Sequence, residues 1–147
     1  MGAFADSVRM NSDAMLKRIQ IQIYTIARQL FIEIVQATPS VTHPGYYAKG
    51  LLANQWYPQL GAGFSPEATE ETDDGGRDSI NRIVTEIDVL SSNPQFLGKD
   101  GTVTLTNNLP YAGRAESVGW PEPEWSGRQG PYHMVALSLQ AIAAKYK

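Results

Sequence analysis

The strongest hydrophobic pattern lies in the first quarter of the chain. Apolar residues recur there at intervals of three or four, the spacing of one face of an α-helix. They are Leu16, Ile19, Ile23, Ile26, Leu30 and Ile34. Ser12 and Asp13 can cap a helix, and Thr38-Pro39 ends one because proline disfavours helix in the preceding residue. We therefore predict a long amphipathic helix from about residue 13 to residue 36, after a weakly patterned lead-in over 1–11.

Two isoleucines break this pattern. Ile21 and Ile32 project toward the polar side of the predicted helix, three turns apart on one flank. One exposed isoleucine is ordinary, but two on one flank indicate a second contact surface. Either another subunit or a loop of the same chain can cover that flank.

The middle of the chain carries shorter patterns. Residues 47–53 suit a short helical turn, and residues 54–60 look extended, with Pro58 favouring an edge strand. A glycine- and acid-rich loop, expected to be mobile, covers 61–78. A second amphipathic helix follows over 79–90. Residues 102–106 alternate in polarity, with Val103 and Leu105 on one face, as a half-buried strand does.

The C-terminal part begins with a turn at Asn107-Asn108. A short helix over 109–117 follows, with Pro110 at the first helical position, where proline is tolerated. A loop over 119–130 leads to a closing helix over 132–146. The order of elements indicates one α+β domain over 1–147. In it a long N-terminal helix packs on a small antiparallel sheet, with additional short helices and a C-terminal helix.

Composition limits the classes of function that the chain can have. Charged residues are 18% of the chain, below the usual quarter, which favours an oligomer that hides part of its surface over a monomer with an uncharged polar surface. The net charge of −3 argues against wrapping nucleic acid, which needs clustered lysine and arginine. The absence of cysteine excludes disulfides and thiolate zinc sites. No apolar stretch is long enough to span a membrane.

The candidate chemistry is sparse. The acids of 67–74 do not follow calcium-loop spacing, and neither His43 nor His133 has a partner at a diagnostic spacing. Glu116 can pair with Arg114 or with an arginine of a neighbouring subunit. We therefore predict no catalytic, cofactor-binding or metal-binding residues. A small hydrolase that uses Glu116 and a histidine is the enzymatic alternative.

Aromatic residues supply the strongest interface candidates. Trp120 and Trp125 bracket a stiff segment of alternating proline and glutamate, and rigid tryptophans give large contact area at little entropic cost. Tyr111 projects from the short helix before them. Both tryptophans can instead fold onto the core of their own domain. We expect one to be buried internally and the other to contact a partner.

Several short motifs occur in a characteristic order. They are Thr38-Pro39, Lys49-Gly50 with Asn54-Gln55-Trp56, Asn107-Asn108-Leu109-Pro110-Tyr111-Ala112, Glu116 with Gly119-Trp120, and Met134-Val135. In these motifs the chain resembles the neck, or tail-completion, proteins of tailed bacteriophages, the minor structural proteins that join head and tail. Leu51 stands where that family usually has a basic residue.

The resemblance implies a virion protein without catalytic activity, assembled in the host cytoplasm. Its copies would close into a homo-oligomeric ring in the neck, around a channel through which DNA passes without sequence-specific binding. Its partners would be a head-side connector and a tail terminator or tail tube. Two alternatives stay open: a tail terminator that caps the tail tube, and a small monomeric protein-binding module.

Overall fold

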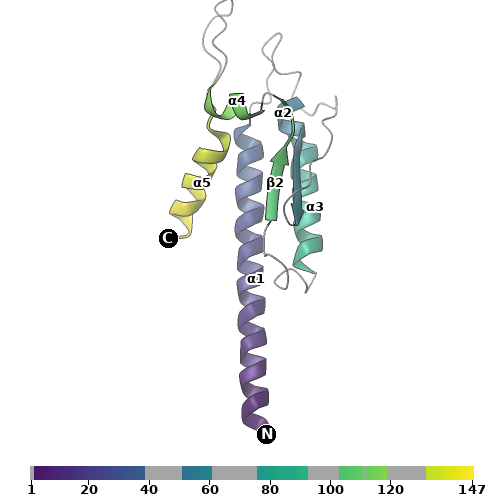
Figure 1. Ribbon diagram of the computed structural model, residues 1–147, viewed down its shortest axis with the longest axis vertical. Coiled ribbons are helices and arrows are strands. Elements are labelled where there is room, and N and C mark those ends of the chain that lie inside the picture. The colour runs from purple at the N-terminus through teal and green to yellow at the C-terminus, as the bar shows by residue number, and fades with distance from the viewer. Residues whose placement is uncertain (1, 39–50, 61–75, 93–102, 111, 119–131) are drawn as a thin grey trace, which may run out of the picture.

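The computed structural model describes residues 2–38, 51–60, 76–92, 103–110, 112–118 and 132–147. Its elements are α1 (Ala3–Ala37), α2 (Leu51–Asn54), β1 (Trp56–Leu60), α3 (Arg77–Ser91), β2 (Val103–Asn107), α4 (Ala112–Ser117) and α5 (Met134–Lys145). The long helix α1 lies in the middle, with α3 and the strands on one side and α5 on the other (Figure 1). The predicted α+β architecture is therefore confirmed.

The strands β1 and β2 pair antiparallel, with Trp56 opposite Asn107 and Leu60 opposite Val103. Among the described residues they form a two-stranded sheet. Within the described residues each strand of this pair has one unpaired edge, and proline, which lacks an N–H group, is tolerated in edge strands such as the one that contains Pro58. Val103 and Leu105 both pack against the core, as their alternation predicts.

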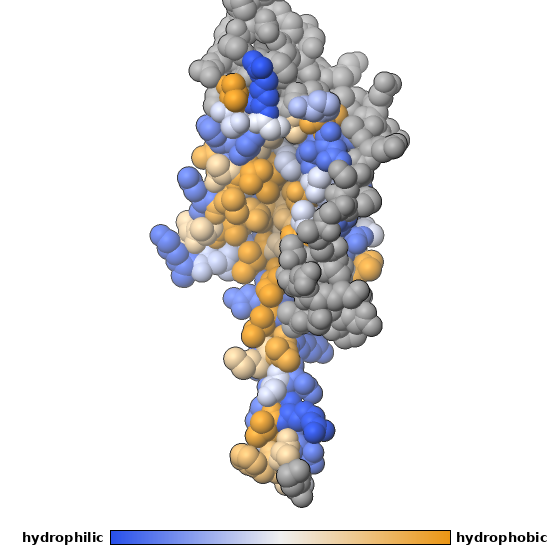
Figure 2. Space-filling view, viewed as in Figure 1, coloured by the Kyte–Doolittle hydropathy of each residue, from blue (hydrophilic) through white to orange (hydrophobic). Residues whose placement is uncertain are grey.

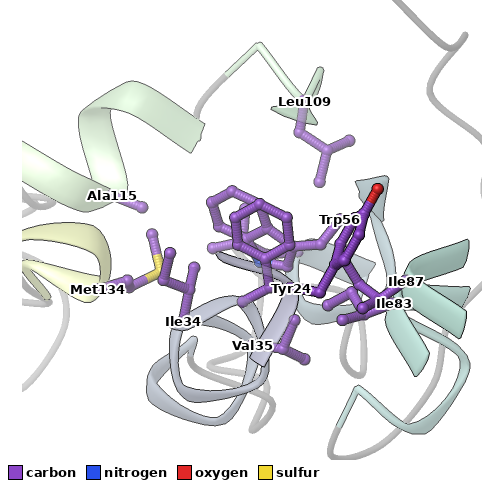
Figure 3. Packing of buried hydrophobic residues seen from close by; sticks show 11 residues of the cluster. Tyr24, Ile34, Val35, Trp56, Ile83, Ile87, Leu109, Ala115 and Met134 are labelled. Atoms are coloured by element: carbon purple, nitrogen blue, oxygen red, sulfur yellow. The ribbon is translucent and has the colours of Figure 1, made fainter. Parts of the chain in front are cut away.

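The core lies beside the C-terminal half of α1. Its buried members come from every helix of the described chain, from β1 and, with Leu109, from the turn after β2, and nine of them are labelled in Figure 3. Tyr24, Phe31, Ile34 and Val35 of α1 pack against Trp56 and against Ile83 and Ile87 of α3. The amphipathic helix predicted over 79–90 is thereby confirmed, with Ile83 and Ile87 on its buried face.

The N-terminal end of α1 differs from the prediction. The helix begins at Ala3, so the lead-in over 1–11 is wrong, and Ser12 and Asp13 lie within the helix instead of capping it. Leu16 and Ile19 belong to the apolar stripe but are exposed. The physical reason is that, among the described residues, the other elements pack along the C-terminal half of α1, and the amphipathic pattern continues past them (Figure 1).

Two further boundaries are corrected. The loop predicted over 61–78 cannot extend to residue 78, because Arg77 and Asp78 belong to α3 and Gly76 is buried at its start. Residues 61–75 lie outside the described residues. Helix α4 begins at Ala112, so Pro110 precedes it instead of opening it. Asn107 stabilises the turn between β2 and α4. Its Oδ1 accepts the Leu109 N–H at 3.2 Å, and its Nδ2 donates to the Leu52 carbonyl at 2.8 Å.

Thr38 joins the end of α1 to the sheet. Its hydroxyl donates to the Ile34 carbonyl at 2.7 Å and accepts the indole N–H of Trp56 at 2.9 Å. Both side chains are buried. A buried donor left without an acceptor costs its full desolvation free energy, so this hydroxyl stabilises both the helix end and the tryptophan.

Thr38→Val is therefore expected to lower the free energy of unfolding by about 1–2 kcal/mol, because valine keeps the shape but cannot accept the indole N–H. Thr38→Ser, which keeps the hydroxyl, is the control and should lose less. Urea unfolding followed by circular dichroism measures both. Equal stability of the valine variant and the wild type would show that the indole finds another acceptor.

Candidate assembly interface

The junction between α4 and α5 is held by backbone hydrogen bonds. The N–H of Tyr132 donates to the Ala115 carbonyl at 2.9 Å, and that of His133 donates to the Glu116 carbonyl at 3.1 Å. His133 precedes α5 in the left-handed conformation, with φ of 48°, which few residues other than glycine adopt. The chain therefore enters α5 at an angle fixed by α4.

Glu116 caps the first turn of α5. Its carboxylate accepts the N–H of Val135 at 3.1 and 3.2 Å and the N–H of Ala136 at 3.1 Å. The N–H groups of a first helical turn have no partner within the helix, and the helix dipole favours negative charge there. Glu116 thus stabilises the start of α5 within its own chain. The contact with a partner stays a prediction.

Helix α5 is apolar beyond the face that it buries. Met134, Ser138 and Ile142, four residues apart, are buried, and the Tyr146 hydroxyl donates to Gln29 Oε1 of α1 at 2.6 Å. Leu137 and Leu139 are 55% and 49% exposed. With about 100° between successive residues, the two leucines lie on opposite flanks of the buried face. Both lie within the closing helix predicted over 132–146.

The visible surface carries a continuous hydrophobic area. In Figure 2 it lies over α5 and the adjoining length of α1, and further orange residues follow along α1 toward the N-terminus, with pale and blue residues among them. A helix that is apolar all round is normally covered on every side, and the described part of this chain leaves the outer sides of α5 open. Exposed apolar surfaces of this kind are typical of interaction sites for proteins, membranes or ligands.

The two isoleucines predicted on one flank of α1 have different environments. Ile21 is 54% exposed and borders a groove between α1 and the end of α3. Ile32 is partly buried and packs against the core, so its predicted position on the polar side is wrong. At this end α1 contacts both α3 and α5, and the core therefore covers more of its circumference than a single stripe.

The groove beside Ile21 has a volume of about 820 Å³ and is lined by apolar and charged side chains, among them Leu16, Lys17 and Arg28. Tyr24 forms part of its wall, and its hydroxyl accepts a 3.5 Å hydrogen bond from Gln20 Nε2. Burial raises the pKa of Tyr24 above its ordinary value of 10.0, while the hydrogen bond from Gln20 acts to lower the pKa. The side chain therefore remains a neutral part of the wall.

The aromatic candidates lie outside the described residues, since neither Tyr111 nor the segment 119–131 with Trp120 and Trp125 is among them. Within the described residues, no cluster of three or more histidine, cysteine or acidic side chains could hold a metal ion. No described helix is long and apolar enough to cross a membrane. His43 is also outside the described ranges.

Comparisons with known proteins do not assign the chain to a family. No protein-family model, curated protein or solved structure matches it.

Proposed function

We propose that the protein is a non-enzymatic structural subunit of a tailed-phage neck, where its copies form a ring at the junction of head and tail. The observation that carries the proposal is the exposed apolar surface of α5, on a helix whose direction is fixed by the Glu116 cap and by the Tyr146–Gln29 hydrogen bond. A rigid apolar surface costs little entropy when it is covered by a partner. The order of motifs that resembles neck proteins supports the same function.

A ring places particular demands on its subunit. Each copy must contact its neighbours through two different surfaces, because a heterologous contact repeats around the axis until the ring closes. Helix α5 offers Leu137 on one flank and Leu139 on the other, with small residues such as Ala136 and Ala143 between them. These features suit a helix that is inserted between neighbouring subunits.

The remaining partners follow from the proposed position. Subunits of a neck ring meet a head-side connector on one side and a tail terminator or tail tube on the other. The Trp120–Trp125 segment is the predicted contact for one of them. A net charge of −3 repels the DNA backbone on average and favours passage of DNA without binding.

The test compares variants of α5 with a variant at a similarly exposed residue elsewhere. We expect wild-type protein to form closed rings in a concentration series, followed by light scattering after size exclusion and by negative-stain images. Leu137→Asp combined with Leu139→Asp should abolish rings, because charges would be buried at both neighbouring contacts. Val89→Asp on α3, where the valine is 56% exposed, is the matched control and should still form rings.

Two results would contradict the proposal. Rings formed by the double aspartate variant would show that α5 is not the contact. A wild-type monomer at every concentration would favour the monomeric binding module. Circular dichroism of each variant separates loss of assembly from loss of folding, and substitutions at such exposed positions usually change stability by about 0.5 kcal/mol or less.

A further inference from the structure

The N-terminal part of α1 extends beyond the other described elements (Figure 1). Every residue from 6 to 19 is exposed. A single helix of this length is marginal in water, since most helical stability in proteins comes from packing of an apolar face. This part of α1 therefore lacks, within the described chain, the packing that stabilises its C-terminal half.

An apolar stripe follows the exposed length. Phe4, Val8, Met15 and Ile19 are spaced four, seven and four residues apart, which keeps them on one face at about 3.6 residues per turn. Their side chains are 84%, 49%, 64% and 40% exposed. Leu30 lies on the same face, three turns beyond Ile19, and packs against the core. The stripe is thus the uncovered continuation of a face that the chain buries elsewhere.

Four of the five charged residues of this segment lie away from the stripe, and the fifth, Arg18, lies on its flank. Asp6, Arg9, Asp13 and Lys17 follow one another at intervals of three or four and can form opposite-charge pairs along the solvent side. Asn11 and Ser12 flank the stripe near its middle. Depletion of charge around an apolar centre is typical of a surface buried between proteins.

The positions in the stripe are symmetric. Phe4 lies as far before the point between Asn11 and Ser12 as Ile19 lies after it, and the same holds for Val8 and Met15. A second copy of the helix in antiparallel orientation therefore places Phe4 against Ile19 and Val8 against Met15, each pair occurring twice. It also places Asn11 opposite Ser12, and both side chains can donate and accept hydrogen bonds. A polar pair at the centre of an apolar seam is a known means of fixing register.

Charge and shape both favour the antiparallel orientation of the two helices. Arg18 is the charged residue nearest the stripe, and a parallel pair would bring both copies of it to the same turn. An antiparallel pair separates them to opposite ends of the contact. It also leaves the two domain bodies at opposite ends, since the described elements lie along the C-terminal half of each α1 (Figure 1).

We infer that the exposed end of α1 binds the same segment of a second copy, as an antiparallel two-fold helix pair. Such a contact is self-complementary and closes at two subunits. It is separate from the α5 contact and does not depend on the proposed ring: where rings also form, the pair would join two rings or two free subunits.

The 147 residues contain no cysteine, which makes a site-specific cross-linking test possible. Full-length Val8→Cys and Met15→Cys variants are mixed and treated with a short bis-maleimide, and the products are identified by intact mass. We expect the mixture to give the product in which a Val8→Cys chain is joined to a Met15→Cys chain. With either variant alone this product cannot form, and the yield of cross-linked dimer should stay near background. A mixture of Val89→Cys and Met15→Cys is the collision control.

The outcomes separate the alternative arrangements. Cross-linking of each variant with itself, with no gain on mixing, would show a parallel pair and overturn the antiparallel assignment. Product no greater than in the collision control would overturn the pairing. Repeating the test with Leu137→Asp and Leu139→Asp present removes the proposed ring contact, so cross-linking there supports the pair whether or not rings exist.

Discussion

Gly76→Ala is expected to be the most damaging of the small substitutions, with a loss of about 2–5 kcal/mol in the free energy of unfolding. Gly76 has φ of +69°, a conformation that costs an L-residue roughly 1–2 kcal/mol. A Cβ at this position would overlap Val35 Cγ1 and lie 3.3 Å from the Ala53 carbonyl oxygen. Val35 is fully packed, and forcing an extra methyl group into a packed core typically costs about 1–3 kcal/mol.

Gly113→Ala is the matched control for this substitution. Gly113 lies on the exposed side of α4, where an added Cβ would meet nothing within 4 Å, and alanine inside a helix is more favourable than glycine by about 0.5–1 kcal/mol. Chemical unfolding should therefore show opposite signs for the two changes. Adding Val35→Ala should return part of the loss at Gly76, because it removes the overlapping methyl group. A Gly76→Ala variant as stable as the wild type would show that the backbone there can relax.

The elements were predictable where the pattern came from burial. The period of α3 and the alternation in β2 follow the core, and both were found close to the predicted bounds. The start of α1 was not predictable in the same way. Ser12 and Asp13 are good capping residues, but they are equally compatible with the solvent side of a continuing helix, and no local rule distinguishes these roles.

Several stabilising contacts depend on residues that are distant in sequence. The Arg82 guanidinium donates to the Asn54 carbonyl and lies 4.2 Å from the centre of the Tyr57 ring, which joins α3 to the strand. Ile32 was assigned to the polar side because the sequence pattern indicates a single buried stripe on α1. In the structure α1 also contacts α5, which lies about a hundred residues later in the chain. Glu116 could be recognised as a helix residue, whereas the helix end that it caps lies beyond a long intervening segment.

Glu116→Ala is expected to lower the free energy of unfolding by about 2–3 kcal/mol, because the carboxylate makes charged hydrogen bonds to two N–H groups of α5. Glu116→Gln keeps an acceptor but loses the charge that interacts with the helix dipole, so its loss should be smaller. Ser117→Ala, on the exposed side of the same helix, is the control. Urea unfolding measures the series.

The larger consequence of Glu116→Ala is expected within α5 itself. Helix α5 buries only one face, and without its cap the backbone at its start is held by fewer bonds, so the helix should open more often than the rest of the domain. Hydrogen exchange of the α5 amides should then accelerate in Glu116→Ala while the amides of α3 stay close to wild type. Since α5 carries Leu137 and Leu139, the same variant should also form fewer rings. Unchanged exchange in α5 would mean that packing against α1 alone fixes the helix, and that Glu116 is available to a partner after all.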